Sequence, residues 1–296
     1  MKLLVLLLLT LCLAAPLRAQ IRLHTPHVES QLYLGSGRHQ PLVVGLGGSE
    51  GGNAWASSHW ATIRNQLLAK GYAFLAIGYF GAPGTPDTLN KIAVEDVYRA
   101  IQAATKNPAV AAGRIALIGG SRGGDLALLL GSYYPAIDCV VALVPSHAVF
   151  PGHTSHFSTS LWTYQGRELP FVPVNEAAVP FLMKRDLRGA FTAMLQDTAA
   201  EKKAAIRVEN IKGPILLLSA TADEIAPTTP MCANLMGRLK QHRFSYPYEH
   251  EAFAGGHAEP LKHFDRVFAF LAKNFPPGAH GPRRATSRTP MPGPSR

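Results

Sequence analysis

A glycine-flanked serine in the middle of the chain constrains the fold more than any other feature. The motif is Gly119-x-Ser121-x-Gly123. An apolar run, 114–118, precedes it, and a second apolar run, 125–134, follows it. This context predicts a buried strand, a sharp turn and a helix, with the serine oxygen exposed at the helix N-terminus. The glycines let the strand and the helix approach closely, so the pattern indicates a nucleophilic serine rather than an ordinary turn.

Apolar runs and amphipathic stretches alternate on both sides of this motif. Strands are expected at 41–46, 72–80, 114–119, 137–144, 213–220 and 243–248, and helices at 89–106, 125–134, 227–241 and 261–274. Parallel strands need crossover connections, so this alternation predicts an α/β fold with a mostly parallel sheet covered by helices on both faces. A ligand of such a sheet is expected at the carboxyl ends of its strands.

Two later loops supply the partners that a nucleophilic serine requires. Asp223 comes just after the apolar run 213–220, and His257 lies in a glycine-rich loop after the run 243–248. The order serine, acid, histidine is the one found in α/β-hydrolases. The expected triad is therefore Ser121 with Asp223 and His257.

Both partners have alternatives. Asp223 would also suit the cap of the helix that follows it, in which case Glu224 is the next candidate acid. His250 competes with His257 as the base, but it is flanked by two glutamates near the end of the last expected strand. The two glycines directly before His257 favour that residue because they let its loop fold back toward the serine.

An acyl-transfer intermediate also needs two backbone N–H donors for its oxyanion. One is expected from Arg122, the residue after the serine. The other is expected from the glycine-rich loop 47–52, with Ser49 as the preferred donor and Glu50 as the second choice. This loop lacks the Lys-Ser/Thr ending of a P-loop and the spacing of a dinucleotide fingerprint. We therefore expect no nucleotide and no other cofactor.

The alternation of strands and helices breaks down between about residues 146 and 212, where prolines and aromatic residues accumulate. We interpret this segment as a lid inserted over the site. Phe80, Trp162 and Tyr164 are candidates for a substrate pocket, and ordinary core packing is the alternative for each.

Histidines and cysteines point to no further chemistry. His147, His153 and His156 have no acidic residue nearby at ligand spacing, so no metal site is expected. Cys139 and Cys232 lie outside the serine motif, and a disulfide bond between them is not favoured.

Both ends of the chain are expected to lie outside the folded domain, which spans 20–275. Residues 1–19 combine Lys2, an apolar core and a small-residue cleavage site, which predicts a signal peptide and an exported protein, periplasmic or extracellular. The apolar core is too short to span a bilayer. Residues 276–296 are rich in Pro, Gly, Ser and Arg, which predicts a disordered tail.

The net charge of +10 does not indicate a nucleic-acid partner. Six of the basic residues lie in the two terminal segments, and the body has no basic helix and no basic run interleaved with aromatic residues. No stable membrane insertion is expected either, and the oligomeric state stays open.

Six segments are similar to those of one protein family. They are Gly48-Ser-Glu-Gly-Gly52, Ala76-Ile-Gly-Tyr-Phe-Gly81, Ile118-Gly-Gly-Ser-Arg-Gly-Gly124, Trp162-Thr-Tyr-Gln-Gly166, Ile206-Arg-Val-Glu-Asn-Ile-Lys-Gly-Pro-Ile215 and Gly256-His257. The chain resembles the C-terminal catalytic domain of the acyl-CoA thioester hydrolase and bile acid-CoA:amino acid N-acyltransferase family. This resemblance implies an α/β-hydrolase fold in which Ser121, Asp223 and His257 form the triad.

The resemblance also implies an activity. Family members use serine or cysteine as the nucleophile, and serine favours hydrolysis. Eukaryotic members carry an N-terminal β-sandwich, for which the stretch before the first core strand here is too short. CoA thioesters are intracellular, so an exported member is expected to cleave a different small-molecule ester or thioester through an acyl-enzyme. The alternatives are acyl transfer to an amine or alcohol, and a non-catalytic lidded protein that binds a ligand.

Overall fold

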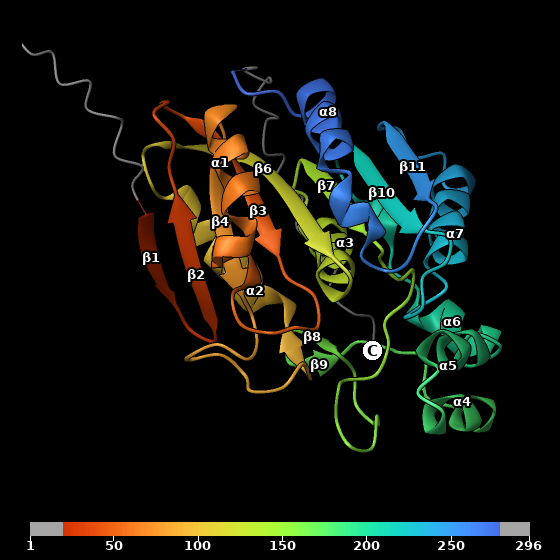
Figure 1. The fold of residues 1–296 in the computed structure, drawn as a ribbon. Coiled ribbons are helices and arrows are strands. Elements are labelled where there is room, and N and C mark those ends of the chain that lie inside the picture. The colour runs from red at the N-terminus through yellow and green to blue at the C-terminus, as the bar shows by residue number, and fades with distance from the viewer. Residues whose placement is uncertain (1–19, 279–296) are drawn as a thin grey trace, which may run out of the picture.

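The computed structural model describes residues 20–278, which form a central sheet flanked by helices (Figure 1). The strand order in the main sheet is β1-β2-β4-β3-β6-β7-β10-β11. These strands are β1 (Gln20–Thr25), β2 (Val28–Tyr33), β3 (Gln40–Leu46), β4 (Ala73–Gly78), β6 (Val110–Gly120), β7 (Cys139–Leu143), β10 (Ile215–Ala220) and β11 (Tyr248–Phe253). All neighbours from β4 to β11 pair in parallel, whereas β2 pairs antiparallel with both β1 and β4. The predicted α/β architecture with a mostly parallel sheet is therefore confirmed.

Helices cover both faces of this sheet. One face packs against α1 (Ala61–Ala69) and α8 (Phe264–Asn274), and the other packs against α2 (Val94–Thr105), α3 (Arg122–Tyr133) and α7 (Thr228–Gln241). The central strands between them are mainly apolar, and every residue of β3, β4, β7 and β10 is buried. Strands buried on both faces need no polar alternation.

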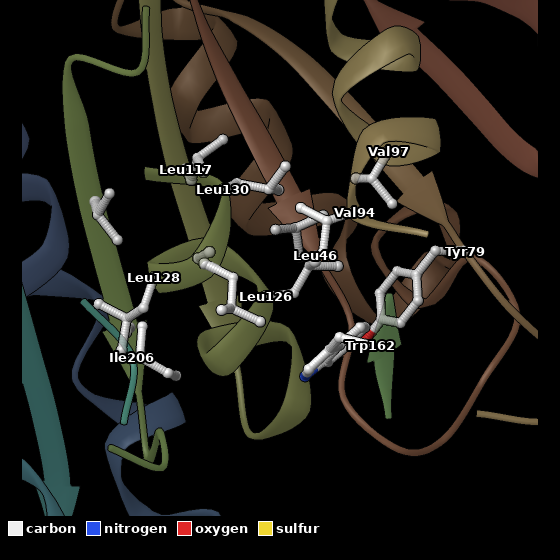
Figure 2. Close-up of a cluster of buried hydrophobic side chains, with 14 of the residues drawn as sticks. Leu46, Tyr79, Val94, Val97, Leu117, Leu126, Leu128, Leu130, Trp162 and Ile206 are labelled. Atoms are coloured by element: carbon white, nitrogen blue, oxygen red, sulfur yellow. The ribbon is translucent and has the colours of Figure 1, made fainter. Parts of the chain in front are cut away.

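Apolar spacing on the helices explains this packing. In α2, Val94, Val97 and Ile101 recur at helical spacing and are fully buried. Figure 2 shows Val94 and Val97 facing Leu46 of β3, with side chains of α3 beside them. Cys139 lies in β7 and Cys232 in α7, and both are buried and free.

Two parts of the sheet differ from the sequence expectation. Residues 20–33 form an antiparallel hairpin at one edge, where the polar sequence of β1 suits a half-exposed strand. The last strand begins at Tyr248 and not at Arg243. Arg243 has a positive φ of 49° just after α7 ends, so the chain turns there before it joins the sheet.

The predicted lid region carries three short helices, α4 (Val179–Met183), α5 (Leu187–Met194) and α6 (Thr198–Ala204). They cluster near the carboxyl end of β10 (Figure 1). Asp186 and Asp197 accept N–H bonds at the starts of α5 and α6, as N-cap residues do. A small second sheet joins β8 (Trp162–Tyr164) and β9 (Arg167–Glu168) to β5 (Ile92–Ala93).

The predicted signal peptide, 1–19, lies outside the described residues, as does 279–296 of the predicted tail. The start of that tail contacts the domain, because Arg114 donates a hydrogen bond of 3.0 Å to the carbonyl of Pro276. Between residues 20 and 278, every helix is too short or too polar to cross a bilayer.

Candidate active site

Ser121 stands on a strained turn between β6 and α3, with φ 53° and ψ −123°. A Cβ atom on Gly119 would overlap the carbonyl oxygen of Gly123, and a Cβ on Gly123 would overlap the carbonyl oxygen of Leu46. Only glycine fits these two positions, which is the close approach that the motif predicts. The surrounding packing therefore holds Ser121 in a conformation that a side-chain residue rarely adopts.

The loops after β6, β10 and β11 bring the three predicted triad residues together. The Nε2 atom of His257 lies 3.1 Å from Oγ of Ser121. The Nδ1 atom of the same imidazole lies 2.9 Å and 3.0 Å from the two carboxylate oxygens of Asp223. One histidine thus bridges a hydroxyl and a carboxylate, which is the arrangement required for activation of a serine.

Asp223 is completely buried and hydrogen-bonded on both carboxylate oxygens. Its Oδ1 accepts N–H bonds from Ile225 and Ala226, and its Oδ2 accepts a 2.7 Å bond from the hydroxyl of Thr228. Burial alone would raise the pKa of Asp223, but the hydrogen bonds from His257 and Thr228 hold that pKa below its usual value. The carboxylate therefore stays ionised, and it organises the loop before α7 while it contacts the imidazole.

The two alternative residues make other contacts. Glu224 accepts a 2.9 Å bond from the backbone N–H of His257, so it holds the histidine loop and not the imidazole. His250 lies in the middle of β11, and its Nε2 is 2.8 Å from the hydroxyl of Ser219 on the neighbouring strand. Burial lowers the pKa of His250. These contacts place His250 in the sheet, away from the serine.

The predicted oxyanion donors border the same cavity as Ser121. Arg122 is the first residue of α3, so its N–H has no acceptor one turn earlier in the helix. In the facing loop, a Cβ on Gly48 would lie only 3.1 Å from Cβ of Ser121. The N–H of Gly48 donates to Oε1 of Glu50 at 3.0 Å. The N–H of Gly48 is thus occupied, and that of Ser49 stays the predicted donor from this loop.

The side chain of Arg122 forms a buried network that the sequence reading missed. Its Nη1 lies 2.9 Å from the carboxylate of Asp125 and 3.2 Å from the hydroxyl of Ser146. Its guanidinium also lies over the rings of Phe150 and Phe191, at 5.4 Å and 5.1 Å from their centroids. The spacing of three residues between Arg122 and Asp125 on one helix was the available signal.

Removing one partner of this buried ion pair should destabilise the protein strongly. Burial raises the pKa of Asp125 even though Arg122 opposes the rise. In Arg122→Met the carboxylate would lose its buried partner, which costs roughly 3–5 kcal/mol. We expect that loss in the free energy of unfolding measured by urea denaturation. Lys262→Met, which breaks the exposed Lys262–Glu259 pair, is the control and should change stability little. Equal stability of the two variants would contradict the prediction.

A cavity of about 720 Å³ opens beside Ser121 and His257. Its wall is mainly apolar, and the side chains that form most of it are Trp55, Trp60, Phe150, Phe157, Val174, Leu182, Leu187, Phe191, Met194, Ile225 and Leu261. Seven of these eleven come from the 146–212 segment, so this segment forms much of the cavity wall. The volume and the lining are typical of a pocket for a small apolar group.

The predicted pocket residues Phe80, Trp162 and Tyr164 do not line this cavity. Trp162 is fully buried in the core, 5.8 Å from the ring of Tyr79, and Figure 2 shows the two side chains there. Phe80 is also buried, and Tyr164 stacks on Tyr133 at 4.2 Å. The structure thus shows core packing for these residues. For Trp162 and Tyr164, pairing of β8 with β5 brings the strand against α2.

The three histidines of the lid region lie in different surroundings. His147 contacts Glu201 at 2.6 Å, an acidic partner that is distant in sequence. His153 borders the cavity, and His156 is exposed outside it. Within residues 20–278, no three histidine, cysteine or acidic side chains are close enough together to hold a metal ion.

Comparison with known proteins places the chain in one family. The family model described as "BAAT / Acyl-CoA thioester hydrolase C terminal" matches residues 94–260. Acyl-coenzyme A thioesterase 1 of Rattus norvegicus is 28% identical over 180 residues, which cover 60% of this chain and 41% of that protein. The mitochondrial acyl-coenzyme A thioesterase 2 of Homo sapiens is 27% identical over 186 residues, which cover 62% and 35%. The chain thus spans less than half the length of these relatives.

Solved structures show the same fold at low sequence identity. An esterase of Pyrococcus furiosus superposes with a TM-score of 0.58 and 15% identity, covering 87% of this chain and 93% of that one. The acetyl xylan esterase of Paenibacillus sp. R4 gives 0.57 and 19%, with coverage of 88% and 86%. These likenesses confirm the predicted α/β-hydrolase fold. Because the family model covers more than half of the sequence, the chain belongs to the BAAT / acyl-CoA thioester hydrolase C-terminal family of α/β-hydrolases.

Proposed function

We propose that this protein is a serine hydrolase that cleaves a carboxylic ester or thioester through an acyl-enzyme intermediate. The observation that carries the proposal is the position of His257, whose imidazole lies within hydrogen-bond distance of both the Ser121 hydroxyl and the Asp223 carboxylate. Membership of a family that contains thioester hydrolases supports the same reaction.

The proposed mechanism has two half-reactions, formation of the acyl-enzyme and its hydrolysis. Ser121 Oγ attacks the acyl carbonyl while Nε2 of His257 takes the hydroxyl proton. Asp223 keeps the other proton on Nδ1 and stabilises the imidazolium. The N–H groups of Ser49 and Arg122 bind the oxyanion. His257 then protonates the leaving group, and a water molecule activated by the same imidazole releases the acid and regenerates Ser121.

The cavity suggests a small or medium acyl group without a CoA carrier. Its volume of about 720 Å³ and its apolar wall suit an acyl chain. Phosphate recognition would need free cationic side chains. Among residues 20–278, Arg122 is the one Lys or Arg that lines the cavity, and its guanidinium is already paired with Asp125. The signal-like features of residues 1–19 support export, which would also separate the protein from the CoA pool.

A comparison of substrates tests this proposal. We expect aryl esters and short thioesters to be turned over at least as efficiently as acyl-CoA with the same acyl group, judged by kcat/KM on the purified protein. Acyl-CoA truncated to its pantetheine portion is the matched control and should perform as well as the full thioester. A strong preference for acyl-CoA that disappears on truncation would contradict the proposed substrate and favour CoA recognition.

A further inference from the structure

The charged side chains that line the cavity do not all have a partner of opposite charge. Arg122 is neutralised by Asp125, at 2.9 Å. His153 is exposed to solvent, and partial desolvation and repulsion from Arg122 both lower the pKa of its imidazole, so it adds no fixed positive charge at neutral pH. Glu50 lines the same cavity and forms no ion pair with any residue between 20 and 278. The wall therefore presents a carboxylate that is exposed to solvent and has no ion-pair partner among these residues.

This carboxylate lies beside the nucleophile. Glu50 Oε1 accepts the N–H of Gly48 at 3.0 Å, and a Cβ on Gly48 would lie 2.8 Å from Glu50 Oε2 and 3.1 Å from Cβ of Ser121. Gly48 is thus in close contact with both the carboxylate and the serine. The oxyanion forms at this serine, and a fixed negative charge nearby raises its energy.

A cation in this cavity would also meet aromatic rings. Trp55 and Trp60 line the same cavity and stack with ring centroids 4.2 Å apart. Indole rings attract ammonium groups electrostatically, and a carboxylate adds a counter-charge. Glu224, which accepts the N–H of His257, adds a second carboxylate close to the site.

We propose that the cavity selects substrates whose leaving group carries a positive charge, such as an amino alcohol, an amino thiol or their quaternary forms, and that Glu50 recognises this charge. The inference rests on the proposed function and names the part of the substrate that the acyl pocket does not bind. A leaving-group cation paired with Glu50 would offset the repulsion between Glu50 and the oxyanion. The preference should therefore appear in kcat as well as in KM.

Three thioesters with one butyryl group and leaving groups of different charge test the inference. They are butyrylthiocholine, its uncharged isostere S-(3,3-dimethylbutyl) thiobutyrate and the anionic S-butyryl-3-mercaptopropanesulfonate. For the full chain at low salt, we expect kcat/KM for the cation to exceed that for the isostere by about tenfold, with the anion slowest. This ratio should fall toward one as salt screens the charge.

Glu50→Gln should bring the ratio of cation to isostere close to one. Both kcat/KM values of the ratio are measured on the same variant. A smaller folded fraction lowers both equally and leaves the ratio unchanged. Glu249→Gln is the matched control because Glu249 is paired with Lys273 at the start of β11, and this variant should keep the wild-type ratio.

Equal kcat/KM for the cation and the isostere in the wild type would overturn the inference, as would a ratio that Glu50→Gln leaves unchanged. In both cases hydrolysis itself would still support the proposed function. If none of the three thioesters were cleaved and a fluorophosphonate failed to label Ser121, the proposed function would fall and the inference with it.

Discussion

Ser121→Ala is expected to abolish covalent labelling by a fluorophosphonate and to lower kcat by about 10⁴–10⁶-fold. The variant lacks the oxygen that forms the acyl-enzyme, and only binding and oxyanion stabilisation remain to accelerate the attack of water. Alanine fits the space of serine, so the free energy of unfolding should change little. Intact-mass spectrometry after labelling and initial rates on an aryl ester measure both effects.

Ser132→Ala is a suitable control for this variant. Ser132 lies on the same helix, α3, and its hydroxyl bonds the carbonyl of Leu129, away from the cavity. It should label and turn over like the wild type. Full labelling of Ser121→Ala would show that another residue is the nucleophile.

His257→Ala is expected to remove the acyl-enzyme burst, with a loss in kcat comparable to that of the serine variant. The two residues act as one unit, so removing either costs about as much as removing both. His250→Ala should cost only a few-fold, because His250 bonds Ser219 within the sheet. Rapid-mixing kinetics with a chromogenic ester separate the burst from steady-state turnover.

The pair of histidine variants also tests the choice between them. Both variants change a histidine to alanine. His250 lies in the last strand, β11, and His257 lies in the loop after it. A lost burst in His250→Ala with a normal burst in His257→Ala would show that the histidine in the sheet is the base. Such a result would require a conformation in which the triad distances differ from those of this structure.

The three residues of the candidate triad could be picked out from the sequence because their signals are local. An elbow serine, an acid just after an apolar strand and a histidine in a glycine-rich loop each need only a few neighbouring residues to be recognised. Parallel strands point the same way, so residues that follow their carboxyl ends gather at one edge of the sheet. Ser121, Asp223 and His257 lie together for this reason, although more than a hundred residues separate the first from the last.

The cavity wall could not be predicted in the same way. Trp162 and Phe191 both lie in the 146–212 segment and both are aromatic, but Trp162 packs into the core while Phe191 faces the cavity. The difference depends on pairing of β8 with β5 and on the path of α5, neither of which has a strong local signal. The position of the last strand also depended on where the chain turns after α7, at Arg243.

By itself, the sequence determined the α/β architecture and the candidate nucleophile with its candidate partners, because strand runs, the glycine-flanked turn and chain order are set by residues close together along the chain. Only the tertiary structure decided which side chains share the cavity and which of its charges are compensated. The guanidinium of Arg122 lies over the ring of Phe191, which comes from α5. Glu50 forms no ion pair with any residue in 20–278. Pairing and burial depend on contacts between segments far apart in sequence, and the charge left facing the substrate follows from those contacts.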